Sequence, residues 1–217
     1  MRIRSYSLVL LGAGMTAGLL GACTPPAGTG DPTTTTTTVP PAHQIDQDNF
    51  PATAPTVSTD LADCVLNPVE PTHVQSAQTF TAGRSGQLDQ VDLMISYRDP
   101  AAAPLSVSIQ STTPAGGPSG VELGSGLYSG PAAENPPAMI PLSSPATVVA
   151  GTKYAIVLAE SACVSTAIGA AWRLQLGIAE YSAGGYWASQ SVGAPNWIDY
   201  FAVFNGDFDI RFRTWVS

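Results

Sequence analysis

Short runs in which apolar and polar residues alternate dominate the chain from about residue 64 onward. The segments 91–97, 105–110, 172–178 and 208–213 each place an apolar side chain at every second position. Because successive side chains of a strand point to opposite faces of a sheet, this pattern predicts strands with one buried face and one polar face. The segment 154–159 is apolar at every position, which predicts a central strand that is covered on both faces.

Turn-forming residues separate these runs. The sequence Thr-Pro-Ala-Gly-Gly-Pro at 113–118 is one example, and the whole chain contains 21 glycines and 19 prolines among 217 residues. Charged residues make up only 11% of the chain, so the glutamates and lysines that favour helices are scarce. Many short strands without a convincing helix predict an all-β fold, an antiparallel β-sandwich of the jelly-roll type, over residues 63–217.

Several of the predicted strands carry short motifs. They are Ala-Gln-Thr-Phe-Thr-Ala-Gly at 77–83, the alternating segments 88–93 and 105–109, the long segment 142–158, and Asp-Ile-Arg-Phe-Arg-Thr-Trp at 209–215. Together they resemble the choice-of-anchor type of β-sandwich domain found in bacterial secreted and surface proteins. The resemblance implies a jelly roll similar to carbohydrate-binding domains. It implies no particular activity, because many members of that family have none assigned.

The first 22 residues have the layout of a signal peptide. Arg2 and Arg4 precede an apolar run, Leu8–Leu20, whose 13 residues are too few for a membrane-spanning helix of about 20. The motif Leu-Gly-Ala-Cys that ends at Cys23 resembles the lipobox of bacterial lipoproteins. The resemblance implies that the leader is removed before Cys23 and that this cysteine carries lipid, which would hold the protein on the extracytoplasmic face of the cell membrane. An ordinary secretory signal with a chance cysteine is the alternative.

Residues 23–62 form the predicted link between the lipid and the domain. The tract has no apolar period, contains seven prolines and includes the threonine run 33–38. Proline removes a hydrogen-bond donor and restricts the backbone, so we expect an extended, disordered tether without strands or helices. Threonines that carry O-linked sugars and threonines without them are equally consistent with this composition.

Cys64 and Cys163 are the cysteines that are left once Cys23 carries lipid. An even pair in an oxidising compartment predicts a disulfide bond between them. The bond would close a loop of about 100 residues and would join the start of the domain to the segment after the central strand. Two buried free thiols are the alternative, and two cysteines are too few for a zinc site.

The formal net charge is −8, from 16 acidic and 8 basic residues. Removal of Arg2 and Arg4 with the leader leaves 6 basic residues and a net charge of −10. Nucleic-acid binding needs a basic surface, so this charge argues against it, and it argues equally against electrostatic docking to an anionic bilayer. The plainer consequence of the charge is solubility. Nothing in the sequence specifies an oligomeric state.

Residues typical of catalysis are sparse. His43 and His73 are the two histidines, and the chain contains no Gly-x-Ser-x-Gly nucleophile motif. The glutamates are scattered, and Glu160 and Glu180, near predicted strand ends, are the remaining candidates for the carboxylate pair of a glycoside hydrolase. The sequence therefore predicts a protein that is not an enzyme and that uses no cofactor.

Asn205, Asp207 and Asp209 place oxygen-bearing side chains at alternate positions. In an extended segment they would share one face, as the ligands of a structural calcium ion do. The acidic residue that completes an EF-hand loop is missing, because Val216 stands at that position. The alternative is a hairpin turn at Asn205-Gly206, a sequence that favours type I′ turns. We therefore predict no metal site, with these three side chains as the remaining calcium candidates.

Aromatic residues concentrate between residues 172 and 204, where three of the four tryptophans lie. Flat apolar rings stack on the C–H faces of sugars, while neighbouring polar groups bond the hydroxyls. The candidate ligand-binding residues are therefore Tyr181, Tyr186, Trp187 and Trp197. A binding site there predicts that Tyr186 and Trp187 lie exposed and roughly coplanar, and the alternative is that these rings close the end of the sandwich.

Two functions from different classes follow from these features. In the first, the domain is a non-catalytic module that binds a glycan or another surface polymer through these rings. In the second, it is a structural or protein-interaction lipoprotein, an adhesin or scaffold, whose aromatic residues are buried and whose sheet has an exposed apolar edge or face. A hydrolase is a third alternative.

Overall fold

The computed structural model describes residues 42–50, 56–61, 63–66, 71–162, 171–178, 181–191, 194–200 and 208–217. The elements whose bounds it gives there are all strands, and every pair of hydrogen-bonded strands is antiparallel. The predicted all-β antiparallel fold is confirmed.

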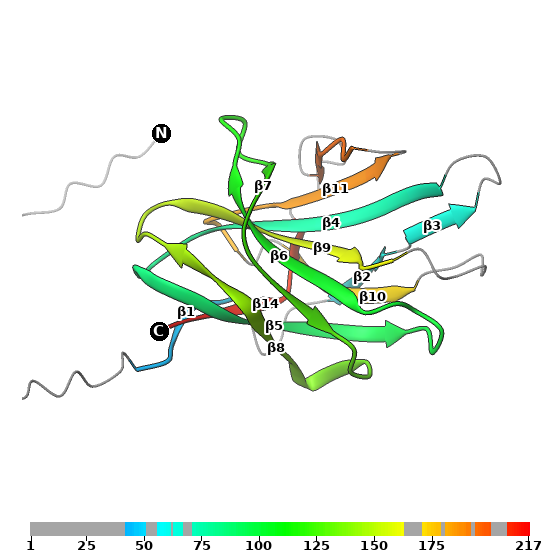
Figure 1. Ribbon diagram of the computed structural model, residues 1–217, viewed down its shortest axis with the longest axis horizontal. Helices are drawn as coiled ribbons and strands as arrows, with labels where there is room; N and C mark the ends of the chain where they lie inside the picture. Colours follow the sequence, from blue (N-terminus) through cyan, green and yellow to red (C-terminus); the bar gives the residue numbers. More distant parts are fainter. Residues whose placement is uncertain are drawn as a thin grey trace, which may run out of the picture. The chain divides into compact units, whose positions relative to one another are not determined.

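The strands pair into one curled sheet that folds over into two layers (Figure 1). Layer A contains, in order, β1 (Gln44–Asp48), β14 (Phe212–Val216), β5 (Gly86–Arg98) and β8 (Ala133–Val148). Beyond the end of β14, the last residues of β5 pair instead with β10 (Trp172–Ile178), which also pairs with β2 (Thr56–Leu61) and β13 (Phe208–Ile210).

Layer B contains the remaining strands. Their order is β7 (Pro118–Tyr128), β6 (Leu105–Thr112), β9 (Lys153–Glu160), β4 (Pro71–Thr81), β11 (Tyr186–Ser191) and β12 (Ile198–Asp199), with β3 (Asp63–Leu66) paired to the first residues of β4. Figure 1 shows β4 and β11 in this layer above β5 and β14 of layer A.

The two layers are joined at one edge, where β7 approaches β8. Ser125 pairs with Ser144 there, and two glycines of β7 make room for the β8 backbone. A Cβ atom at Gly124 would lie 2.5 Å from the carbonyl oxygen of Ser144, and one at Gly126 would lie 2.6 Å from that of Pro141. The glycines are therefore required by the close approach of two strands rather than by a turn.

The core lies between the layers and follows the alternation of the sequence. Val91, Leu93 and Ile95 of β5 are fully buried, as are the apolar positions 105, 107 and 109 of β6. The predicted central strand is confirmed as β9, which lies between β4 and β6 and is buried at every residue from Tyr154 to Leu158. The turn predicted at 113–118 is confirmed by a hydrogen bond from the Thr113 amide to the Gly117 carbonyl oxygen.

The predicted boundary between tether and domain, at residues 62 and 63, is wrong by about twenty residues. Gln44–Asp48 pairs with β14 as β1, and Thr56–Leu61 pairs with β10 as β2. The prolines at 40, 41, 51 and 55 flank these short strands instead of interrupting them. Residues 1–41, with the predicted signal peptide and Cys23, lie outside the described part of the chain.

The predicted polar face of the segment 208–213 is also wrong in part. Asp209 is fully buried, and Arg211, with 6% of its surface exposed, is buried as well. The Asp209 carboxylate accepts hydrogen bonds from Gln78 Nε2 and from the Tyr181 amide, both at 2.9 Å. Asp209 of layer A and Gln78 of layer B thus form a buried hydrogen bond between the layers, at a position where alternation predicts a solvent-exposed side chain.

Candidate functional site

Strand β11 separates the predicted aromatic cluster into two groups, because adjacent residues of a strand face opposite ways. Tyr186 points between the layers and is 4% exposed. Its hydroxyl lies 2.8 Å from Thr59 Oγ1 and 3.0 Å from Ser76 Oγ, so it bridges β2 and β4. Burial raises the pKa of the Tyr186 phenol. The expectation that Tyr186 is exposed and coplanar with Trp187 is therefore wrong.

Tyr181 is half-buried and braces the loop that precedes β11. Its ring packs edge-on against Phe212, with the ring centroids 5.1 Å apart. Its hydroxyl donates to Gln47 Oε1 at 2.8 Å, which ties the loop to β1. Burial raises the pKa of Tyr181 to about 12. These contacts explain Tyr181 as part of the framework.

Trp187 and Trp197 lie on the outer face of layer B, and both are half-buried. They pack against a small apolar cluster that is separate from the main core and consists of Ala77, Ala155 and Val157. In register, Trp187 stands opposite Ala77 on β4, and Ala77 stands opposite Val157 on β9. Small side chains next to Trp187 let its ring lie over the sheet.

Gly117, in the turn between β6 and β7, completes the seat of Trp187. A Cβ atom at Gly117 would lie 2.7 Å from the six-membered ring of Trp187. Trp187 therefore fits between the sheet and the turn only because residue 117 has no side chain. The ring position is fixed by packing, as a preorganised binding surface requires.

Neutral polar groups surround this surface. The Asn196 amide donates to Ser189 Oγ at 2.9 Å, which holds the segment that carries Trp197 against β11. On β6, Gln110 Nε2 donates to Ser108 Oγ at 3.2 Å, and Ser108 stands opposite Val157. We call the area formed by Trp187, Trp197 and these neighbours the tryptophan surface. Two indole rings beside amides and hydroxyls are the chemistry that binds the faces and edges of sugar rings.

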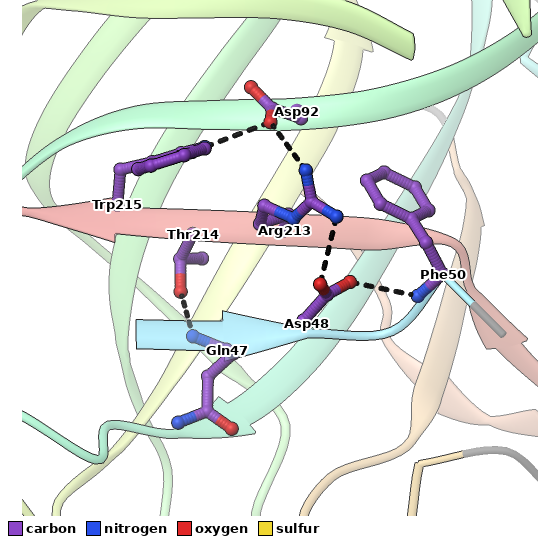
Figure 2. A network of polar contacts seen from close by, with 7 residues as sticks. All are labelled: Gln47, Asp48, Phe50, Asp92, Arg213, Thr214 and Trp215. Carbon is purple, nitrogen blue, oxygen red and sulfur yellow. Dashed lines mark hydrogen bonds and ion pairs between the residues drawn. The ribbon is translucent and has the colours of Figure 1, made fainter. Parts of the chain in front are cut away.

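A second aromatic cluster, which the sequence did not predict, lies on the outer face of layer A. Figure 2 shows Arg213 of β14 between Asp48 and Asp92, with Trp215 and Phe50 beside it. Arg213 Nη2 lies 2.8 Å from Asp48 Oδ2, and Arg213 Nη1 lies 3.8 Å from Asp92 Oδ2. Trp215 Nε1 donates to the same Asp92 oxygen at 2.8 Å. The guanidinium also lies 5.0 Å from the Phe50 ring centroid.

His43 covers Trp215 in this cluster. The two rings are stacked, with centroids 4.9 Å apart and planes inclined by 25°. His43 Nε2 lies 2.8 Å from Asp89 Oδ1, so the side chain contacts two different strands of layer A. The acidic and basic side chains of this cluster pair with one another, and the pair of Arg213 with Asp48 joins β14 to β1. The tryptophan surface is accordingly the stronger binding candidate.

The other candidate residues have structural explanations or lie outside the described residues. Asp209 already accepts two hydrogen bonds, and its proposed calcium partners, Asn205 and Asp207, lie outside the described residues together with the predicted turn at Asn205-Gly206. In the described stretches, no group of three or more His, Cys, Asp or Glu side chains is placed to hold a metal ion. Glu160 is buried and accepts a hydrogen bond from the Ala103 amide at 2.7 Å, while Glu180 is not described.

The predicted cysteine pair is placed only in part. The backbone of Cys64 lies in β3, and Cys163 lies outside the described residues. The disulfide therefore stays a prediction.

No protein-family model matches this sequence, and no curated protein matches it either. Within the described ranges, no helix is long and apolar enough to cross a membrane. The case for a function therefore depends on the chemistry of the surfaces themselves.

Proposed function

We propose that this chain is a lipid-anchored surface protein whose β-sandwich binds a glycan or another surface polymer without chemical turnover. The single observation that carries the proposal is the tryptophan surface. Trp187 and Trp197 are held partly exposed on the outer face of layer B by small residues beneath them. A ring that is fixed before binding loses little conformational entropy when a ligand stacks on it.

The tryptophan surface lies on the layer that the predicted tether does not join. The described chain enters layer A through β1, whereas Trp187 and Trp197 lie on the outer face of layer B. With β1 inside the domain, the tether from Cys23 shortens to residues 23–41. At about 3.1 Å per residue this tract would reach at most about 60 Å.

Binding is tested with Trp187→Ala and Trp197→Ala in pull-down and calorimetric assays against cell-wall and host polysaccharides. Each variant should lose at least about tenfold in affinity, since a stacked ring contributes about 1 kcal/mol or more beyond its buried area. Met139→Ala is the matched control, because Met139 is 65% exposed on β8 of layer A. Full binding by both tryptophan variants with unchanged melting temperatures would remove the tryptophan surface from consideration.

The anchor is tested separately, because it rests on the lipobox resemblance alone. Cys23→Ala should fail to incorporate labelled palmitate and should move the protein from the membrane fraction to the soluble fraction. A Cys23→Ala protein that stays in the membrane fraction would show that another segment anchors it.

One observation favours the second candidate function, a structural or protein-interaction lipoprotein. Three large apolar side chains on β7 are exposed: Val121 at 57%, Leu123 at 37% and Leu127 at 61%. An exposed apolar strand is typical of an interaction surface. If Leu127→Ser abolishes self-association or partner capture while no polysaccharide binds the unmodified protein, this second function replaces the first.

A further inference from the structure

Backbone pairing joins the two layers at the edge where β7 meets β8, whereas side chains join them at the opposite edge. There β2 is the outer strand of layer A and β11 with β12 is the outer part of layer B. Among the described residues no backbone pairing links β2 to β11 or β12. Side chains bridge the gap instead, through the Tyr186 hydroxyl and Thr59.

Two cavities flank this bridge. One, of about 340 Å³, is lined by Thr59, Asp60, Val74, Tyr186, Ala188, Ser189, Gln190, Ile198 and Tyr200. The other, of about 170 Å³, lies toward β10 and shares Thr59, Tyr186 and Tyr200 with the first. We call the two together the inter-layer cleft. The larger cavity alone is within the size range of small-molecule sites, which begins at about 300 Å³.

The rings of Tyr186 and Tyr200 lie between the two cavities of the cleft. Tyr200 packs against Tyr186, with centroids 5.0 Å apart and planes inclined by 60°. Tyr200 also packs edge-on against Phe208 at 6.1 Å. The rings of Tyr186 and Tyr200 line both cavities, so a ring-shaped ligand in either one would meet an aromatic wall.

The lining of the cleft is mostly uncharged. Asp60 is the one charged side chain among the residues that line the cleft, and its Oδ1 is 2.6 Å from Arg173 Nε. The other polar residues that line the larger cavity all have uncharged side chains: Thr59, Tyr186, Ser189, Gln190 and Tyr200. Neutral donors and acceptors beside apolar rings match a neutral, hydroxylated ring.

We propose that the inter-layer cleft binds the terminal sugar residue of a neutral glycan. This inference rests on the proposed function for its ligand class, and it adds that recognition occurs at a chain end. The cleft opens at an edge of the sandwich and is only large enough for a small group. The tryptophan surface would contact residues farther along the same polymer.

The experiment measures binding of neutral oligosaccharides of glucose, galactose and mannose in series of increasing length. Two variants change the cleft: Gln190→Leu removes the amide while approximately preserving volume, and Ala188→Leu fills the larger cavity. Gln44→Leu is the matched control for the first, because Gln44 is an exposed glutamine on β1 of layer A. Gln190 is also exposed, so this variant stays informative if Ala188→Leu fails to fold.

The expected result is molar affinity that rises with chain length only until the oligosaccharide reaches from the cleft to the tryptophan surface and then stays constant. Each cleft variant should lose at least about tenfold, and Gln44→Leu should show no change. Polysaccharide binding that Trp187→Ala abolishes and that both cleft variants retain would overturn the cleft site alone. Failure of every neutral saccharide to bind, while another surface polymer binds through Trp187, would overturn the cleft proposal and leave the proposed function standing. Uptake of an uncharged apolar dye such as Nile red without saccharide binding, blocked by Ala188→Leu, would overturn the cleft proposal in favour of an apolar ligand.

Discussion

Gly184 and Gly185 stand side by side before β11 and differ sharply in the space around them. A Cβ atom at Gly184 would overlap the carbonyl oxygen of Thr79, whereas nothing lies within 4 Å of one at Gly185. The contact at Gly184 is with backbone, which cannot rotate away as a side chain does.

Gly184→Ala should therefore lower the free energy of unfolding by about 3 kcal/mol, the upper part of the usual range for overpacking. Gly185→Ala is the matched control and should change it by less than about 0.5 kcal/mol. Urea denaturation measures both. Equal effects of the two substitutions would show that the loop does not pack on β4 as described.

Tyr181 links the same loop to β1, and its ionisation has a predictable effect. Burial raises its pKa from 10.0 to about 12 in the folded protein, so the unfolded chain loses this proton first. The stabilisation is complete below pH 10, decreases as the pH rises above 10 and is lost through about pH 12.

Tyr181→Phe should cost about 1 kcal/mol at neutral pH through the lost hydrogen bond to Gln47. The variant should also lose less stability than the unmodified protein between pH 10 and 12, the window set by the Tyr181 pKa. Denaturation curves across this pH range make the comparison. Parallel declines in the two proteins would contradict the burial of the Tyr181 hydroxyl.

The burial of a single residue was predictable from sequence where it depends only on the alternation within that residue's own strand. Val91, Leu93 and Ile95 are buried because alternation is a property of one strand, read within a few residues. Trp187 could be singled out for the same reason, but alternation, applied to β11, would also have turned Tyr186 inward. The cluster around Arg213 was not predictable, since Arg213 and Asp48 are 165 residues apart.

At the scale of elements, β1 is the largest departure from expectation. Five residues with four polar side chains show no apolar period, so the sequence gives little sign of a strand. Its stability comes from partners: β14 along the backbone, and Arg213 and Tyr181 through side chains. Trp215 adds a contact to the residue before β1, since its ring stacks on His43.

A chain that begins at residue 51 should therefore be less stable than one that begins at residue 42. We expect the free energy of unfolding to fall by about 3 kcal/mol or more, because several hydrogen bonds of about 1 kcal/mol each are lost. Thermal and urea unfolding of the two chains provide the measurement. Identical stability would mean that β1 is dispensable and that the tether extends at least to residue 50.

The strand pairing also bears on the predicted disulfide. His73 of β4 pairs with Asp63 of β3 and with Ser191 of β11, so β3 and β11 occupy opposite edges of β4. Farther along, Ser76 pairs with β11 and β9, which are likewise on opposite edges. It follows that β3 continues along the same edge of β4 as β9.

This arrangement places Cys64, in β3, near the end of β9 at Glu160. Cys163 follows Glu160 by three residues, a reach of about 10 Å. Electrospray mass after alkylation without reductant should therefore show both cysteines unmodified by the reagent, with a mass 2 Da below the reduced form (about two hydrogens). Two alkylated thiols under these conditions would exclude the bond.

Strands β7 and β8 explain why element boundaries were harder to predict than buried faces. β8 contains Pro136, Pro137, Pro141 and Pro145, and β7 contains three glycines. These residues normally mark turns. In this fold they lie at the edge where the layers join, and there proline costs few ladder hydrogen bonds and glycine permits close contact.

At the scale of the whole domain, the two outer faces use aromatic residues differently. On layer A, His43, Trp215 and Arg213 contact each other and secure β1. On layer B, Trp187 and Trp197 rest on small residues with neutral polar groups around them. The all-β class was predictable from composition and alternation. The assignment of each aromatic residue to a face was not, because it depends on the pairing of distant strands.

The most direct test of the proposed function follows the four indole N–H signals by NMR, assigned with single Trp→Phe variants, during titration with a polysaccharide that binds the protein. The tryptophan surface predicts that the signals of Trp187 and Trp197 shift, while those of buried Trp172 and of Trp215, which is bonded to Asp92, stay in place. Movement of the Trp215 signal without those of Trp187 and Trp197 would place binding on layer A and contradict the proposal.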